Sequence, residues 1–432
     1  MGGMTMPFPA AGGAWWAPSA PLDDTARADD RRVADRRWDP LLVCVAAYIL
    51  TAVGRIHQLF APLELIHLAV IAGVLAIVLF VIDGNSLRRV KDVRGPTATL
   101  IAAFIFWMMV TVPTALVIGT SFDLVFNNFI KTAVMSLIIA ASVRGVRDVE
   151  RLVFVYLVAA VVYASVIVTR FDANAAGDGR LGHLYYYDAN DFATFVVTAM
   201  PLAIHFLYSG ESRRIRLFAA AGLVVLTFGF VWAGSRGGFI ALVAVTAFVI
   251  FRFSAIPLRW RGWGTAMMAA VLLATASEQY WERMQTITSE QDYNHTSETG
   301  RLQIWGRGID YMVGNPVLGV GAGNFPAAEG ILSPLAERQQ FGIGVRWNAP
   351  HNSYVQVGAE LGVPGLALYI AVIVSAFFAL RHGGRLTPPL AAALLGFVIG
   401  SVFLSLAYSE MLYTLIALAV GLRKVAGRAV EC

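Results

Sequence analysis

Two arginines and one histidine lie where the chain could bind an anion. Arg236 is in the sequence Gly-Ser-Arg-Gly-Gly at residues 234–238, between two apolar stretches, and Arg301 and His351 lie in the later segment 278–352. A guanidinium group binds two phosphate oxygens at once. His351 directly precedes another apolar stretch, and the positive end of a helix starting there would point toward a bound anion.

Each of these side chains also has a structural interpretation. Taken alone, Arg236 would be a headgroup anchor, Arg301 a charge on a surface helix and His351 a helix-capping or interfacial residue. Arg180, in another segment expected outside the membrane, is either a third phosphate contact or a loop charge. The functional interpretation requires the arginines and the histidine to converge in space.

Residues that could hydrogen-bond a sugar stand at the start of two apolar stretches. Asp188 and Asn190 follow three consecutive tyrosines at residues 185–187, and Asn352 and Tyr354 open a later stretch. Asp and Asn are also ordinary helix caps, and tyrosines at a membrane boundary form an interfacial belt. We therefore interpret these residues either as contacts to the substrate or as helix caps and interfacial residues.

A polar stripe runs into one apolar stretch. Asn352, Gln356 and Glu360 recur every four residues, which places them on one face of a helix. Polar groups at membrane depth normally face a bundle interior or a wet cavity. Lys131 lies near the middle of a different stretch, at a depth comparable to that of Glu360. We expect a structural ion pair between these two residues.

The segment 278–352 is too long to be a simple connection, and loops of this length are usually functional. Within it, apolar residues recur at helical spacing at positions 302, 305, 309, 312 and 313, which predicts a helix that lies along the membrane surface or caps a cavity. Arg301 borders this apolar face, whereas Arg307 and Asp310 point away from it. We prefer to interpret Trp305 as a residue that packs in the membrane rather than as one that stacks on a sugar.

Three glycines follow a helix-breaking Asn-Pro pair at residues 315–316. Gly319, Gly321 and Gly323 alternate with other residues. Such spacing permits close approach of a ligand to the backbone, but the lysine of a nucleotide P-loop is missing. We interpret the glycines as turn residues.

The composition indicates a helical membrane protein. Of the 432 residues, 57% are hydrophobic and only 14% are charged, and the mean hydropathy is +0.65. A soluble domain carries about a quarter of its residues as charge. Apolar runs without strand-like alternation argue against an outer-membrane barrel. The sequence therefore predicts an all-α, polytopic membrane protein.

About twelve stretches have the length and apolarity of a transmembrane helix. They lie near residues 40–55, 63–82, 98–118, 124–142, 152–169, 189–208, 217–233, 238–252, 263–277, 353–380, 389–408 and 410–422. This divides the chain into transmembrane helices 1–9 within 38–277, a large outer loop at 278–352, and transmembrane helices 10–12 within 353–422.

The distribution of basic residues sets the expected orientation. Most of the 33 Lys and Arg residues fall in alternate connections, which the positive-inside rule assigns to the cytoplasm. Both ends are then cytoplasmic: a disordered tail at 1–37 and a short tail at 423–432. The net charge of +5 reflects this orientation, so no nucleic-acid partner is expected.

The order of the motifs resembles the O-antigen ligase and polymerase superfamily. The resemblance covers about residues 40–422, with its motifs between 185 and 366. The motifs are the Asp-Ala-Asn-Asp-Phe-Ala sequence at 188–193, Ser-Arg-Gly-Gly at 235–238, Arg301 followed by Trp305, Asn-Pro at 315–316, the glycines at 319, 321 and 323, His-Asn-Ser-Tyr at 351–354, and Gly362 with Gly365.

This resemblance implies a membrane glycosyltransferase of the GT-C class in the bacterial inner membrane, with its active site on the periplasmic side. The donor would be a glycan on undecaprenyl pyrophosphate, and in the ligase branch the acceptor is a sugar hydroxyl of lipid A-core. By motif, Arg236 and Arg301 match the two essential arginines of the family, and His351 matches its essential histidine. The family needs no metal and no nucleotide cofactor.

The chemistry implied by the resemblance has a simple division of roles. The arginines would stabilise the charge that develops on the departing pyrophosphate. His351 would accept the proton of the acceptor hydroxyl. The nearby arginines and the helix N-terminus disfavour imidazolium, so the histidine should be neutral. A single displacement predicts inversion at the anomeric carbon.

Three alternatives stay open. A polymerase that extends the lipid-linked glycan and a protein O-oligosaccharyltransferase use the same donor and share much of this pattern. A lipid-linked glycan transporter would also explain many membrane spans and polar residues at membrane depth. The missing internal repeat argues against transport, and the absence of the arginine-x10-glycine repeat of some polymerases favours the ligase.

Overall fold

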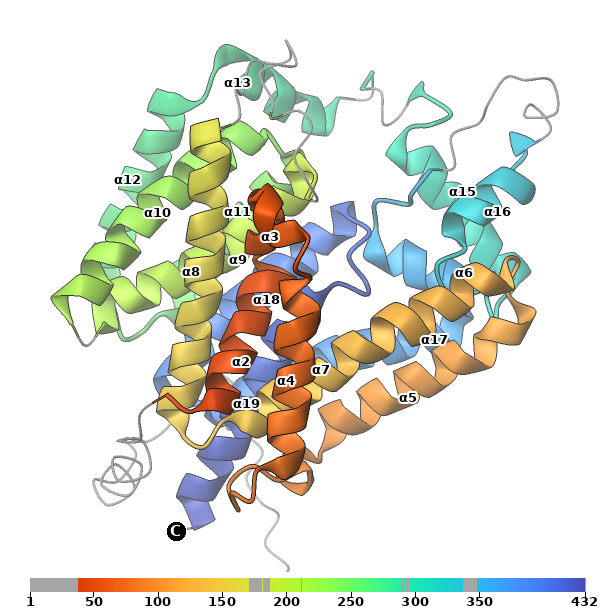
Figure 1. Ribbon diagram of the computed structural model, residues 1–432. Coiled ribbons are helices and arrows are strands. Elements are labelled where there is room, and N and C mark those ends of the chain that lie inside the picture. The colour runs from red at the N-terminus through yellow and green to blue at the C-terminus, as the bar shows by residue number, and fades with distance from the viewer. Residues whose placement is uncertain are drawn as a thin grey trace, which may run out of the picture.

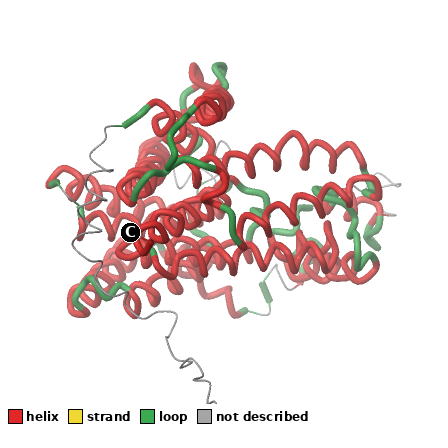
Figure 2. The backbone as a smooth tube through the Cα atoms, turned by 90° about the horizontal axis from the view of Figure 1, so that it is seen from below, coloured by secondary structure: helices red, strands yellow, loops and turns green. Residues whose placement is uncertain are grey.

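The computed structural model describes residues 38–170, 181, 187–210, 212–289, 291–292, 296–336 and 348–431. The predicted disordered tail at 1–37 lies outside the described residues. Within the described part the chain is helical and contains no strand, as Figure 2 shows. This confirms the predicted all-α class.

The first half of the chain forms helices that begin and end near the predicted spans. They are α2 (Pro40–Tyr48) with the continuing η1 (Ile49–Val53), η2 (Ile56–Leu59), α3 (Ala61–Glu64), α4 (Leu68–Ile82), η3 (Val90–Val93), α5 (Pro96–Thr111), η4 (Val112–Thr114), α6 (Ile118–Phe122), η5 (Asp123–Phe129), α7 (Ile130–Ser142), α8 (Val146–Arg170) and α9 (Ala189–Ser209).

The second half adds both long and short helices. They are α10 (Arg213–Ala233), α11 (Arg236–Arg252), α12 (Leu258–Thr275), α13 (Glu278–Gln285), η6 (Thr286–Thr288), α15 (Arg301–Gly314), α16 (Phe325–Ile331), α17 (Ser353–Ala379), η8 (Leu380–His382), η9 (Gly384–Leu386), α18 (Thr387–Gly400), η10 (Ser401–Phe403) and α19 (Glu410–Glu431). In Figure 1, α13, α15 and α16 lie at the end of the molecule opposite to the C-terminus.

Seven helical stretches of the described chain are long and apolar enough to cross a membrane. They are Pro96–Thr114, Ile118–Ser142, Val146–Arg170, Ala189–Ser209, Arg213–Ala233, Ser353–Ala379 and Gly384–Phe403, and Pro40–Val53 and Leu68–Ile82 are shorter apolar helices. A multi-pass membrane protein is thereby supported. The count of about twelve spans stays a prediction.

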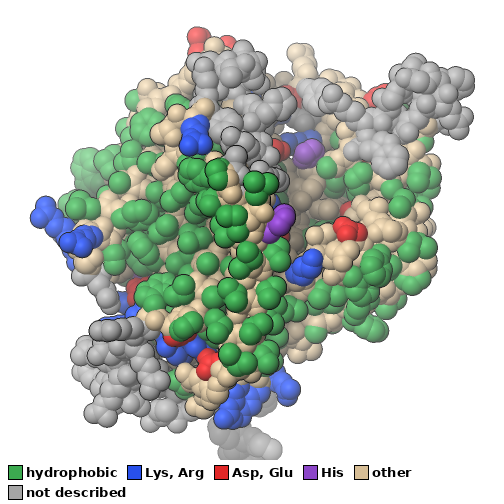
Figure 3. Space-filling view, in the orientation of Figure 1, with side chains coloured by type: hydrophobic (Ala, Val, Ile, Leu, Met, Phe, Trp, Pro, Cys, Tyr) green, Lys and Arg blue, Asp and Glu red, His purple; other side chains and the backbone are tan. Residues whose placement is uncertain are grey.

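The outer surface has the character expected of a protein in lipid. On α4, the side chains of Val70, Val74, Val78 and Val81 are exposed at helical spacing. Figure 3 shows hydrophobic side chains over the middle of the molecule, with basic side chains at its lower and left edges. The apolar band and the basic rim match a hydrocarbon core and a headgroup region.

The helix α17 is interrupted at Gly362, whose φ of 68° and ψ of −173° are not helical. The segment 316–321 lies against the interruption and replaces the lost helical hydrogen bonds. The N–H groups of Val320 and Gly321 donate to the carbonyl oxygens of Ala359 and Glu360, each at 2.9 Å. Since no water is available in lipid, a broken helix needs such internal partners.

The glycines at 319, 321 and 323 allow this contact. All three have positive φ, so they adopt a backbone conformation that favours glycine. A Cβ atom on Gly319 would overlap the backbone carbonyl group of Glu360. The glycines are therefore turn residues, as interpreted from the sequence, and they also pack backbone against a membrane helix.

The expected ion pair between Lys131 and Glu360 is wrong. Lys131 is exposed on α7, whereas Glu360 is buried. The carboxylate of Glu360 accepts hydrogen bonds from the Tyr408 hydroxyl at 2.7 Å and from the backbone N–H of Phe325 at 3.4 Å. Two side chains at a similar depth in the bilayer do not meet when one faces the outside of the helix bundle and the other faces its interior.

Candidate active site

The start of α11 positions Arg236. Gly234 ends α10 with a left-handed φ of 56°, and the Ser235 hydroxyl then caps α11 by accepting a hydrogen bond from the N–H of Gly238 at 3.1 Å. A Cβ atom on Gly237 would lie 2.7 Å from the Cβ of Phe403. The glycines thus let the first turn of α11 pack closely on η10, and Arg236 is fixed at that turn.

The guanidinium of Arg236 reaches the outer segment. Its Nη1 donates to Thr286 Oγ1 at 2.6 Å and to Asp292 Oδ2 at 2.8 Å, and the guanidinium side chain is 26% exposed. Asp292 therefore serves as a counter-ion for Arg236 in this structure. Sequence analysis did not single out Asp292, because a lone acidic residue in a polar loop has no pattern.

Arg301 is the first residue of α15, one helical turn before Trp305. The predicted helix is confirmed, and its buried face is formed by Ile304, Gly308 and Tyr311. The face that carries Leu302, Ile309 and Val313 is the exposed one, at 40%, 48% and 69%. This apolar exposure suits contact with the membrane surface. Arg301 is half-buried at the start of the helix.

The neighbouring Arg307 has a structural role. It forms hydrogen bonds of 2.8 and 2.5 Å to the carboxylate of Glu329, whose side chain is fully buried, and the hydroxyl of Tyr311 donates to the same group at 2.7 Å. These hydrogen bonds raise the pKa of Arg307 above its usual value. The pair fixes α15 to α16.

The backbone at His351 is held from both sides. The residue adopts a left-handed φ of 46°, which is unusual for a side chain with a Cβ. Its N–H donates to Ser405 Oγ at 3.0 Å, and the carbonyl oxygen of the preceding Pro350 accepts a hydrogen bond from Trp305 Nε1 at 2.9 Å. The imidazole is therefore presented from a fixed, strained turn directly before α17.

The three segments that carry Arg236, Arg301 and His351 meet around Phe403. The ring of Phe403 lies 6.2 Å from that of Trp305, and its Cβ contacts the Gly237 backbone at the start of α11. Trp305 in turn binds Pro350, next to the histidine. The starts of α11, α15 and α17 are thus neighbours. The functional interpretation requires these segments to be neighbours, and it further predicts that the side chains of Arg236, Arg301 and His351 face one pocket.

Asn352 and Tyr354 use their polar atoms within the protein. Asn352 Oδ1 caps α17 by accepting from the N–H groups of Tyr354 and Val355 at 2.9 and 3.0 Å. The Tyr354 hydroxyl donates to the carbonyl oxygen of Val398 at 3.0 Å. Both residues position the start of α17. A direct contact with substrate stays a prediction for them.

The start of α9 lies at the same end of the bundle. Asp188 forms a capping box with Asp191 and accepts from the N–H groups of Asn190 and Asp191 at 2.7 and 2.8 Å. Tyr187 stacks under the guanidinium of Arg55 at 5.3 Å from its ring centre. Asp188 and Asn190 thus have clear structural roles, and their contact with a sugar stays a prediction. Arg180 and the tyrosines at 185–186 lie outside the described residues.

Arg55 is a further cation that sequence analysis did not select. Its Nη2 lies 3.9 Å from Glu410 Oε2 at the start of α19, directly after the connection 401–409 that holds His351. Figure 3 shows a hollow between the part of the molecule that carries α3 and the part that carries α15 and α16, with histidine and basic side chains in it. Arg55 and Arg236 at this end of the bundle are each paired with a carboxylate, Glu410 and Asp292.

The donor set of the site favours anion binding. In the described ranges, no three His, Cys, Asp or Glu side chains gather as a metal site. The starts of three helices are neighbours there instead, and Arg236 and Arg301 are the first residues of two of them. Helix N-termini and guanidinium groups both bind phosphate oxygens.

Part of the chain matches a known protein family. Residues 221–370 match the family described as O-Antigen ligase. The match begins within α10 and ends within α17, so it contains Arg236, Arg301 and His351. No curated protein matches the chain. The match supports, over residues 221–370, the family resemblance drawn from the motifs.

Proposed function

Because residues 221–370 match the O-antigen ligase family, we propose that this membrane protein is a glycosyltransferase. It transfers an O-antigen glycan from undecaprenyl pyrophosphate to a sugar hydroxyl of lipid A-core. The reaction takes place on the periplasmic side of the bacterial inner membrane, with both ends of the chain in the cytoplasm. Residues 278–352 are the periplasmic segment in this proposal, and it carries Arg301 and His351.

The observation that supports this proposal best is the meeting of three helix starts around Phe403. Arg236 begins α11, Arg301 begins α15, and His351 directly precedes α17. The helices α11 and α15 have 17 and 14 residues, and the first part of α17 runs without interruption from Ser353 to Leu361. Each carries partial positive charge at its start. Together with the guanidinium groups, these helix starts would stabilise a pyrophosphate far better than a neutral sugar.

The proposed reaction is a single displacement. The oxygen of the acceptor hydroxyl forms a bond to the anomeric carbon of the donor glycan, while the bond from that carbon to the phosphate oxygen breaks. The hydroxyl proton passes to the imidazole of His351. The electron pair of the broken bond stays on the carrier pyrophosphate, where Arg236 and Arg301 stabilise the new charge. The configuration at the anomeric carbon is inverted.

Asp292 modulates this charge in our proposal. Its carboxylate binds Arg236 at 2.8 Å. A pyrophosphate oxygen that approaches Arg236 competes with this carboxylate. The ion pair therefore keeps the guanidinium of Arg236 oriented between turnovers. It also lowers the affinity for the donor, because the carboxylate must be displaced when the pyrophosphate binds.

In vitro transfer tests the proposal. The purified protein is supplied with a defined glycan on undecaprenyl pyrophosphate and with core lipid, and the products are separated by mass. We expect glycan-capped core from the wild-type protein and none from His351→Ala. Longer carrier-linked glycan without capped core would identify a polymerase instead, and unchanged substrates with glycan moved across a vesicle membrane would identify a transporter.

A further inference from the structure

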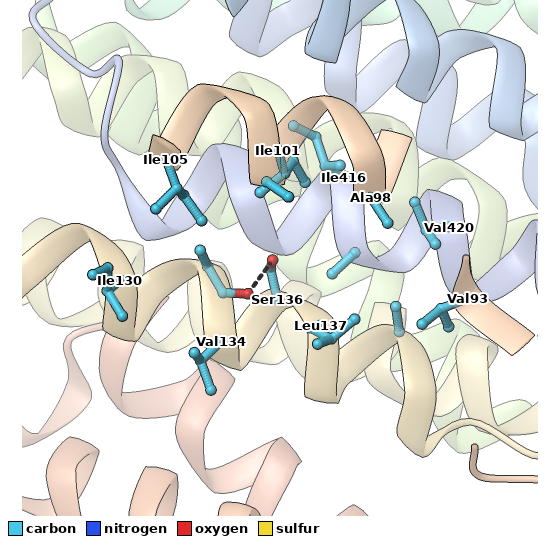
Figure 4. Close-up of a pocket in the computed structure, with 14 residues that line it drawn as sticks. Val93, Ala98, Ile101, Ile105, Ile130, Val134, Ser136, Leu137, Ile416 and Val420 are labelled. Carbon is cyan, nitrogen blue, oxygen red and sulfur yellow. Dashed lines mark hydrogen bonds between the residues drawn. The ribbon is translucent and has the colours of Figure 1, made fainter. Parts of the chain in front are cut away.

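A cavity of about 260 Å³ lies between α5, α7 and α19, away from the candidate active site. Its walls are formed by residues one helical turn apart on each helix, including Ile101 and Ile105 of α5, Leu137 of α7 and Val420 of α19. Figure 4 shows Val93 and Val420 at one end of this cavity and Ile105 and Ile130 at the other. The cavity is therefore elongated along the helices.

The walls can take only an apolar occupant. Among the lining residues, all of them described, Ser136 alone has a polar side chain. Its hydroxyl already donates to the carbonyl oxygen of Ala133 at 2.8 Å, within α7. Because α5 and α7 belong to two of the candidate membrane spans, the cavity opens into hydrocarbon. A hydrocarbon chain fits these walls, whereas a sugar or a phosphate does not.

Basic residues surround the end of the cavity at Val93. Lys91 and Arg94, on either side of Val93, are exposed, as is Arg89. Arg423 lies over the same backbone and donates to the carbonyl oxygens of Val93 and Arg94 at 3.4 and 3.3 Å. Asp92 is the acidic residue of this segment, so the balance is positive.

We propose that the cavity binds one acyl chain of an anionic phospholipid, whose headgroup lies beside Lys91 and Arg94. Clusters of basic residues next to a membrane span attract anionic headgroups. The anionic headgroup then lies on the basic residues, and the acyl chain lies in the adjoining apolar cavity.

The lipid belongs to the leaflet opposite to the candidate active site. The helix α19 starts at Glu410 near that site, and Val420 is ten residues further along, about 15 Å at 1.5 Å per residue. Arg423 lies a further turn away. A carrier lipid with its pyrophosphate at Arg236 would have its headgroup at the wrong end of the cavity.

Photolabelling in lipid nanodiscs tests the proposal. The probe is a phosphatidylglycerol with a diazirine in one acyl chain, and labelled residues are mapped by peptide mass spectrometry. We expect labels on residues 93–105 and 130–140. Ala102→Phe, which projects a ring into the cavity from an exposed position, should reduce labelling at least fivefold. Val110→Phe on the same helix, outside the cavity, should not.

The headgroup is tested by a separate pair of variants. Replacing both Lys91 and Arg94 with Gln should reduce labelling severalfold without filling the cavity. Replacing Arg213 and Arg214 with Gln, two exposed cations elsewhere, should leave it unchanged. Equal labelling by the matching phosphatidylcholine probe, unchanged labelling of Ala102→Phe, or displacement by polyprenyl phosphate but not by phosphatidylglycerol would each overturn the proposal.

Discussion

Trp305 Nε1 donates a hydrogen bond of 2.9 Å to the carbonyl oxygen of Pro350, the residue before His351. On the other side, the N–H of His351 donates to Ser405 Oγ. A left-handed backbone at a residue with a Cβ costs of order 1–3 kcal/mol and persists only when its surroundings enforce it. The position of the imidazole therefore depends on α15 and on the connection 401–409.

Trp305→Phe tests this dependence. The phenyl ring can keep the contact with Phe403 but cannot bind Pro350. Loss of one hydrogen bond of about 1 kcal/mol should reduce kcat roughly fivefold with little change in KM for the donor. The measurement is initial-rate kinetics of glycan transfer in detergent. Trp263→Phe, at a side chain that is 71% exposed on α12, should behave like the wild-type protein.

His351→Gln should lower kcat by about 10² to 10⁴, the usual contribution of a general base. The variant should fold normally, because the backbone hydrogen bonds on both sides remain. His67→Gln is a matched control, since His67 is exposed and has a similar left-handed φ of 49°. A rate for His351→Gln within threefold of the wild-type rate would remove the histidine from the chemistry.

The sequence predicts the parts of this site that depend on local signals. The helix start at Asn352 follows from a side chain that caps, and α15 follows from apolar spacing. Apolarity alone also predicts the class of protein. These features require no knowledge of which segments are neighbours in space.

The parts that depend on distant partners were beyond sequence reasoning. The interruption of α17 at Gly362 exists because a segment some forty residues earlier replaces its hydrogen bonds. Ser405 and Asp292 also could not be identified from the sequence, because Ser405 binds the backbone of His351 and Asp292 binds the side chain of Arg236, both far away along the chain. The expected ion pair between Lys131 and Glu360 was wrong for the same reason. The sequence indicates how deep each residue lies in the membrane, but not toward which neighbouring helix its side chain points.

Asp292→Asn should tighten donor binding. The carboxylate competes with pyrophosphate for Arg236, and a partly exposed ion pair contributes up to about 1 kcal/mol. KM for the donor should therefore fall by a factor of about two to five. In the Arg236→Lys background the same substitution should have a smaller effect, since the bidentate guanidinium is gone. A rise in KM on Asp292→Asn would show that the carboxylate assists the donor site.

Glycan transfer should continue unchanged in EDTA. The charge of the departing pyrophosphate is stabilised by Arg236, Arg301 and the helix starts, so no divalent ion is required in our proposal. The assay is transfer rate after dialysis against chelator, with and without added Mg²⁺ or Mn²⁺. Activity that is lost in EDTA and restored by either ion would contradict the proposed mechanism.

Gly319→Ala should destabilise the protein. Gly319 has a φ of +65°, and an added Cβ would overlap the carbonyl group of Glu360, which is backbone and cannot move aside easily. Strain and overpacking together should lower the free energy of unfolding by about 3 kcal/mol. The measurement is thermal unfolding in detergent. Gly314→Ala, where an added Cβ meets no atom within 4 Å, should change stability by less than about 0.5 kcal/mol. Equal stability of the two variants would mean that the contact between the glycine segment and the interrupted α17 contributes little to the fold.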